Sequence, residues 1–132
     1  MTLQGLMLCD DLIFFSRVAG TARTIEATVR MEKTSADLLT TARQHPPSGI
    51  ILDLQNPGLD LPQLLQDLSA TCPTMPCVVA YGSHVEAETL RAARTAGCDH
   101  VMPRSQFVER LESDLGKWLG LKEKTSRDSN QK

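Results

Sequence analysis

Residues 49–58 of this chain have the sequence Gly-Ile-Ile-Leu-Asp-Leu-Gln-Asn-Pro-Gly. A short apolar run bounded by turn-forming residues is typical of a buried parallel strand and not of a helix. Asp53 stands at the carboxyl end of this predicted strand. Because open α/β sheets build their sites at the carboxyl ends of their strands, we expect Asp53 to be a functional residue and not a packing residue.

Strand-like and helix-like segments alternate on both sides of this stretch. Short apolar or β-branched runs predict four further strands, at residues 6–9, 28–31, 77–81 and 100–102. Thr34, Asp60 and the capping-box sequence Ser83–Glu86 predict helix starts, and Gly97 predicts a helix end. Five strands and five helices in strict alternation predict an α/β fold with a doubly wound parallel sheet. For this sheet we expect the strand order 2-1-3-4-5.

Composition limits the class of protein. The 132 residues predict a single domain over residues 1–121, followed by a flexible polar tail at 122–132. A net charge of −2 gives no basic stripe for direct nucleic-acid binding, and no apolar stretch approaches the roughly 20 residues that span a bilayer. The four cysteines lack zinc-site spacing, which favours free thiols and a cytoplasmic, reducing location.

Three carboxylates follow the first and third predicted strands: Asp10 and Asp11 after the first, and Asp53 after the third. These strands are neighbours in the predicted sheet, so we expect the three side chains to meet in one crevice. Three close anions repel one another unless a cation compensates, and Mg²⁺ is the hard cation that suits carboxylates and phosphate oxygens. The arrangement permits a metal-assisted carboxylate nucleophile that forms an aspartyl-phosphate.

The sequence resembles the receiver domain of bacterial two-component response regulators over roughly Leu6 to Leu119. The order and spacing of a few residues carry the resemblance: Asp10-Asp11, Asp53, Pro57 and the pair Ala96-Gly97. The resemblance implies the flavodoxin-like receiver fold. It also implies a phosphoprotein in phosphorelay signalling that is not an enzyme beyond Mg²⁺-assisted phosphorylation and dephosphorylation of itself.

Residue by residue, the resemblance implies that Asp53 is the phosphoacceptor. Asp10, Asp11 and Asp53 would hold Mg²⁺ together with the backbone carbonyl of Gln55. A histidine kinase or a phosphotransfer protein would donate the phosphoryl group from a phosphohistidine, and an unidentified protein partner would receive the signal. Receivers often form homodimers, which here would use the face formed by residues 85–118.

The chain departs from the receiver pattern at the end of the site that reads out phosphorylation. The position of the switch Thr or Ser falls on Gly82, with Ser83 beside it as a substitute hydroxyl or simply a helix cap. Arg104 replaces the usual Lys, and Val101 replaces the usual aromatic residue. Tyr81 is expected to be a packed or half-exposed aromatic residue.

Three functions follow from this sequence. The first is an atypical stand-alone receiver that is phosphorylated on Asp53 and acts through a protein partner. The second is a pseudo-receiver, an interaction module that phosphate does not switch. The third is a small flavodoxin-like enzyme or ligand carrier, which the absence of a glycine-rich phosphate loop after the first strand disfavours.

Overall fold

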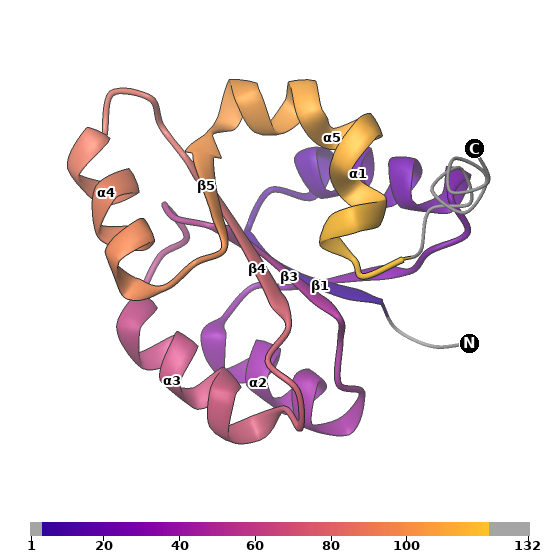
Figure 1. Ribbon diagram of the computed structural model, residues 1–132, viewed down its shortest axis with the longest axis horizontal. Helices are drawn as coiled ribbons and strands as arrows, with labels where there is room; N and C mark the ends of the chain where they lie inside the picture. Colours follow the sequence, from indigo (N-terminus) through magenta and orange to yellow (C-terminus); the bar gives the residue numbers. More distant parts are fainter. Residues whose placement is uncertain (1–3, 122–132) are drawn as a thin grey trace, which may run out of the picture.

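The computed structural model describes residues 4–121, and Figure 1 shows its helices packed around a central sheet. The predicted flexible tail, 122–132, lies outside these residues. Strands and helices alternate along the chain in the order β1 (Gly5–Leu8), α1 (Leu12–Thr24), β2 (Val29–Glu32), α2 (Ser35–Gln44), β3 (Gly49–Asp53), α3 (Leu61–Thr71), β4 (Cys77–Gly82), α4 (Ala87–Ala96), β5 (His100–Pro103) and α5 (Arg104–Trp118).

The sheet has five parallel strands in the order β2-β1-β3-β4-β5, which confirms the predicted topology. β1 and β3 are direct neighbours, and Leu8 pairs with Leu52 at their carboxyl ends. The residues that follow these two strands therefore begin at the same edge of the sheet. β2 begins at Val29, one residue later than predicted.

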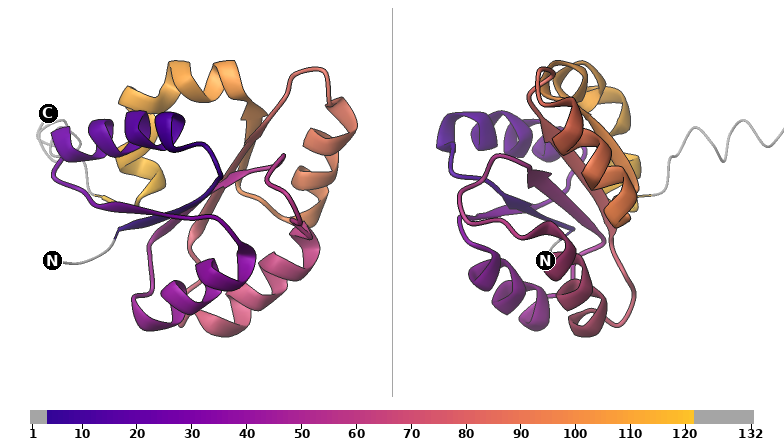
Figure 2. Two further views of the ribbon diagram at one scale, coloured as in Figure 1. Left: turned by 180° about the vertical axis from the view of Figure 1, so that it is seen from behind. Right: turned by 90° about the vertical axis from the view of Figure 1, so that its left-hand side faces the viewer.

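Apolar side chains on the two faces of the sheet form two cores, because successive residues of a strand point to opposite faces. One face, which includes Ile51 and Tyr81, packs against α1 and α5. The other face, which includes Leu52 and Ala80, packs mainly against α2 and α3. Figures 1 and 2 show this division, with α1 and α5 together on one side of the sheet and α2 and α3 on the other.

Side-chain caps fix the starts of three helices. The side chains of Asp11, Thr34 and Asp60 each accept a hydrogen bond from the backbone N–H three residues later. The predicted helix starts at Thr34 and Asp60 are thus confirmed, and Gly97 ends α4 in the left-handed conformation as predicted (φ 114°). The predicted capping box at Ser83–Glu86 is wrong: its residues form a turn and α4 begins only at Ala87.

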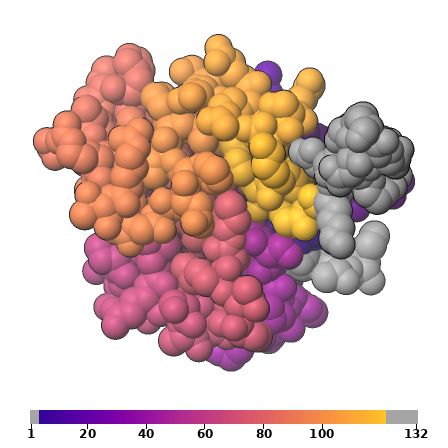
Figure 3. Space-filling view, in the orientation of Figure 1, coloured from indigo at the N-terminus to yellow at the C-terminus, as the bar shows by residue number. Residues whose placement is uncertain are grey.

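The surface that was expected to serve a homodimer, residues 85–118, includes α4, β5 and α5. In the space-filling view of Figure 3 the same segments, in orange to yellow, occupy the upper part of the face shown. No helix within residues 4–121 combines the length and the apolar character that a membrane crossing requires.

Candidate functional site

Asp53 is the last residue of β3, at the carboxyl edge of the sheet. It points to the same face as Ile51, two residues earlier, and so toward α1 and α5. Its Oδ1 atom accepts the backbone N–H of Gln55 at 2.9 Å, which closes a turn after the strand. The pKa of Asp53 is raised, mainly because the carboxyl is partly buried. The hydrogen bond from Gln55 and the charge of Arg104 lower this pKa, and the charge of Asp11 raises it, without changing the net direction.

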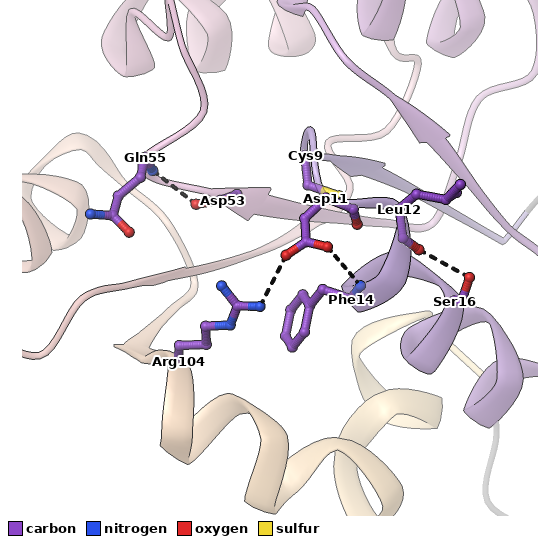
Figure 4. A network of polar contacts seen from close by, with 8 residues as sticks. All are labelled: Cys9, Asp11, Leu12, Phe14, Ser16, Asp53, Gln55 and Arg104. Carbon is purple, nitrogen blue, oxygen red and sulfur yellow. Dashed lines mark hydrogen bonds and ion pairs between the residues drawn. The ribbon is translucent and has the colours of Figure 1, made fainter.

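Asp11 occupies the N-cap position of α1 and uses both carboxylate oxygens. Oδ1 accepts the backbone N–H of Phe14 at 3.0 Å, and Oδ2 lies 3.3 Å from a guanidinium nitrogen of Arg104. The bond from Phe14, and the bond and charge of Arg104, hold the pKa of Asp11 below its usual value. Figure 4 shows Arg104 reaching from the start of α5 to this carboxylate.

Arg104 is the cation of the site. Its guanidinium carbon lies 4.0 Å from the centre of the Phe14 ring, so the side chain is stacked on an aromatic face as well as paired with Asp11. The same charge lowers the pKa of Asp53. The structure therefore brings together Asp11, Asp53 and Arg104, which come from the ends of β1 and β3 and from the start of α5.

Asp10 does not join this group. Its side chain is more than half exposed and lies 3.9 Å from the ammonium of Lys33, which follows β2. Within residues 4–121 no group of three His, Cys, Asp or Glu side chains gathers that could hold a metal ion. With Asp10 turned to Lys33 and both oxygens of Asp11 engaged, these side chains do not fit the predicted Mg²⁺ site as they stand.

Tyr81, and not Gly82, is the neighbour of Asp53 on the adjacent strand. The parallel register of β3 and β4 pairs Asp53 with Tyr81, so both side chains point toward α1 and α5. A side chain at Gly82 would point to the other face, where a Cβ atom would meet Leu90 and Leu54. Gly82, the predicted switch position, therefore does not face Asp53, because spacing along the sequence does not show which residue of β4 pairs with Asp53.

Ser83 contributes its hydroxyl to a local turn, where its Oγ accepts the backbone N–H of Val85 at 3.3 Å. Val101 is half-buried against the core on the α2 and α3 face, away from Asp53. Tyr81 is fully buried, at 1% exposure, and packs between Phe14 and Phe107. Of the predicted site residues, Asp10, Gly82 and Ser83 thus lie beside the group and do not take part in its contacts.

Two residues of the site were not predicted. Phe14 is an apolar residue of α1, and its stacking against Arg104 leaves no signal in the sequence. Asn56 is buried and donates its side-chain amide to the backbone carbonyl of Lys33 at 2.9 Å, which ties the loop after β3 to the loop after β2. A polar residue beside Pro57 predicts a turn, but it does not predict the contact with Lys33.

The raised pKa of Asp53 predicts a pH-dependent effect of Asp53→Asn on stability. Because folding favours the protonated carboxyl, the contribution of Asp53 to stability is present below its unfolded pKa, about 3.9, and is lost as pH rises through the folded pKa. We expect Asp53→Asn to be more stable than the wild type at pH 7, and the difference to shrink toward pH 4. Urea denaturation across this range measures it, with exposed Glu109→Gln as the control. A difference that does not change with pH would contradict the prediction.

No protein-family model matches the chain, and no curated protein sequence matches it. Solved structures do match. The receiver domain of NtrX from Brucella abortus is 22% identical, with a TM-score of 0.73 over 89% of this chain and 99% of that domain. The chain spans only 29% of a longer NtrX structure.

Two further solved structures have the same fold. The receiver domain of the response regulator Ssk1 from Saccharomyces cerevisiae, crystallised with the phosphotransfer protein Ypd1, is 15% identical, with a TM-score of 0.73 over 89% of this chain and 88% of that chain. The receiver domain of histidine kinase PA1611 from Pseudomonas aeruginosa, with magnesium in its active-site cleft, is 16% identical, with a TM-score of 0.72 over 91% of this chain and 99% of that chain. The chain thus has the fold of response regulator receiver domains, as predicted.

Proposed function

We propose that this chain is an atypical receiver whose Asp53 accepts a phosphoryl group and whose altered surface then binds a protein partner. One observation carries the proposal: Asp53 ends β3 of a receiver fold within the field of an arginine, Arg104, that is held at the start of α5. A carboxylate nucleophile beside a fixed cation is the minimum that transfer of a negatively charged phosphoryl group needs. In this proposal the chain is a phosphoryl acceptor and not an enzyme that acts on other substrates.

The transfer would begin with the phosphohistidine of a histidine kinase or a phosphotransfer protein. One carboxylate oxygen of Asp53 bonds to phosphorus while the P–N bond of the donor breaks. The electron pair of that bond stays on the imidazole nitrogen, and the imidazole, protonated on its other nitrogen, leaves neutral. Oδ1 of Asp53 accepts a hydrogen bond from the backbone N–H of Gln55, so Oδ2 is the oxygen that is available to attack phosphorus.

Arg104 would stabilise the charge on the transferred group. Its present ion pair with Asp11 joins two side chains that are nearly half exposed, and solvent weakens such pairs. Charge-assisted hydrogen bonds to phosphate oxygens are stronger, and a guanidinium has five N–H donors. A phosphoryl group on Asp53 would therefore draw Arg104 away from Asp11, and this movement changes the surface between α1 and α5.

The phosphoryl donor, the cellular location and the cofactor belong to the same proposal. The co-crystal of Ypd1 with the Ssk1 receiver supports a phosphotransfer protein as the kind of donor, and a cytoplasmic location suits such an exchange. Magnesium in the cleft of the PA1611 receiver supports Mg²⁺ as the cofactor of this fold. In this chain the ion would compete with Arg104 for Asp11.

Incubation with acetyl phosphate tests the proposal. We expect intact-mass spectrometry to show a gain of one phosphate in the wild type and none in Asp53→Asn. Asp37→Asn is the matched control, because it removes an exposed carboxylate of α2, outside the site, and should leave the gain in place. Parallel reactions in Mg²⁺ and in EDTA show whether the ion is required. A gain that survives in Asp53→Asn would contradict Asp53 as the acceptor.

A pseudo-receiver is the second candidate, and the ion pair between Arg104 and Asp11 favours it, because it engages a carboxylate that a metal would need. In that case neither acetyl phosphate nor a phosphorylated donor protein would add mass to the wild type, in Mg²⁺ or in EDTA. The protein would instead bind its partner equally well as wild type and as Asp53→Asn. Absence of any mass gain would thus replace the first function by the second.

A further inference from the structure

Tyr81 has a side chain that its surroundings do not satisfy. It is 1% exposed, and its hydroxyl is buried without a hydrogen-bond partner among residues 4–121. A buried hydroxyl without a partner is unfavourable, and such groups call for an explanation. An apolar ring of the same shape, that of phenylalanine, would fill this place between Phe14 and Phe107 without that penalty.

Tyr81 lies next to the charged groups of the candidate site. Tyr81 pairs with Asp53 in the sheet register, and its ring lies edge-on to Phe14, with centroids 5.2 Å apart, while Arg104 stacks on that same Phe14 ring. Burial is the main cause that raises the pKa of Tyr81, and the charge of Asp53 raises it further. The phenol is therefore neutral at physiological pH and has a proton to donate.

The Tyr81 hydroxyl has no acceptor within residues 4–121, and Oδ1 of Asp53 accepts the backbone N–H of Gln55 instead. A phosphoryl group on Asp53 would bring three strong acceptor oxygens to this edge of the sheet. From these contacts we infer that the Tyr81 hydroxyl donates a hydrogen bond to the phosphoryl group on Asp53 and so positions it. The inference rests on the proposed function, and it assigns to Tyr81 the role that the sequence placed at Gly82 or Ser83.

The chain contains one tyrosine, which makes the inference directly measurable. Protein labelled with 3-fluorotyrosine has a single ¹⁹F signal, from position 81. We expect this signal to shift when acetyl phosphate phosphorylates the wild type, and to stay unchanged in Asp53→Asn. Mass spectrometry of the same samples reports phosphorylation independently of the tyrosine.

A second measurement separates positioning from packing. Tyr81→Phe keeps the ring and removes only the hydroxyl, so the variant should fold and still gain one phosphate. Since a hydrogen bond to a charged group is lost, we expect its phosphate to hydrolyse about ten-fold faster than that of the wild type. Ser83→Ala, which removes the neighbouring hydroxyl, should leave the hydrolysis rate unchanged.

The outcomes are distinguishable. No mass gain in the wild type would overturn the proposed function and this inference with it. A normal mass gain with an unmoved fluorine signal would overturn the role of Tyr81 alone. A hydrolysis rate in Tyr81→Phe that is equal to or slower than that of the wild type would do the same, even with a fluorine shift. A shift together with faster hydrolysis supports the inference.

Discussion

Arg104→Ala is expected to slow phosphorylation of Asp53 by acetyl phosphate about a hundred-fold, the usual effect of removing one preorganised donor from a charge-stabilising site. The transferred group is negatively charged, and in the group of Asp11, Asp53 and Arg104 the guanidinium is the only positive charge. Without it, Asp11 and Asp53 repel both each other and the incoming phosphoryl group. The rate of mass gain over time measures the effect.

Two controls sharpen this experiment. Arg104→Lys keeps a positive charge but loses the planar group that stacks on Phe14, so we expect a rate between those of the wild type and the alanine variant. Arg91→Ala removes a cation that pairs with Glu88 on α4, away from the site, and should not change the rate. Equal rates in the wild type and Arg104→Ala would show that Arg104 does not stabilise the transferred group.

The sequence was sufficient for the fold because the relevant signals are local. Apolar runs that end in turn residues located the strands, and strict alternation with helices predicted a parallel sheet. Asp53 could be placed for the same reason, since it ends a strand, whereas Arg104 was placed by the resemblance to the receiver pattern. The helix starts at Thr34 and Asp60 follow from the side-chain oxygen at the N-cap, which needs no tertiary contact.

The site could not be completed from sequence because its details depend on contacts between distant segments. Asp10 and Asp11 are adjacent and chemically identical, and only the cap at Phe14 and the contact with Lys33 separate their roles. The place opposite Asp53 depends on the register of β4 against β3, which put Tyr81 there in place of Gly82. A turn at Ser83 also imitates a capping box, and only the structure shows that α4 begins later.

Gly49→Ala is expected to destabilise the protein by about 3 kcal/mol, the upper part of the usual range for overpacking a core. Gly49 begins β3 and is buried, and the end of α5 crosses directly over it. A Cβ atom there would clash with the backbone carbonyl oxygen of Trp118 and lie 3.2 Å from the side chain of Leu119. Because backbone atoms cannot rotate away, α5 must move off the sheet.

The loss should lower the melting temperature by about 10 °C, measured by circular dichroism. Gly5→Ala and Gly20→Ala are graded controls. Gly5 pairs with Gly49 in the neighbouring strand, but its added Cβ would press on the Leu119 side chain, which has freedom to shift, so a smaller loss is expected. Gly20 lies in α1, and a Cβ atom added there would lie 3.7 Å from its nearest neighbour, so alanine should stabilise the helix by about 0.5–1 kcal/mol.

Equal stabilities of Gly49→Ala and Gly5→Ala would show that α5 does not press its backbone onto β3. If Gly49→Ala loses more stability than Gly5→Ala, the contact of Trp118 and Leu119 with β3 anchors the carboxyl end of α5. The first residue of this helix is Arg104, which supplies the positive charge of the site. The contact therefore also fixes where that charge lies.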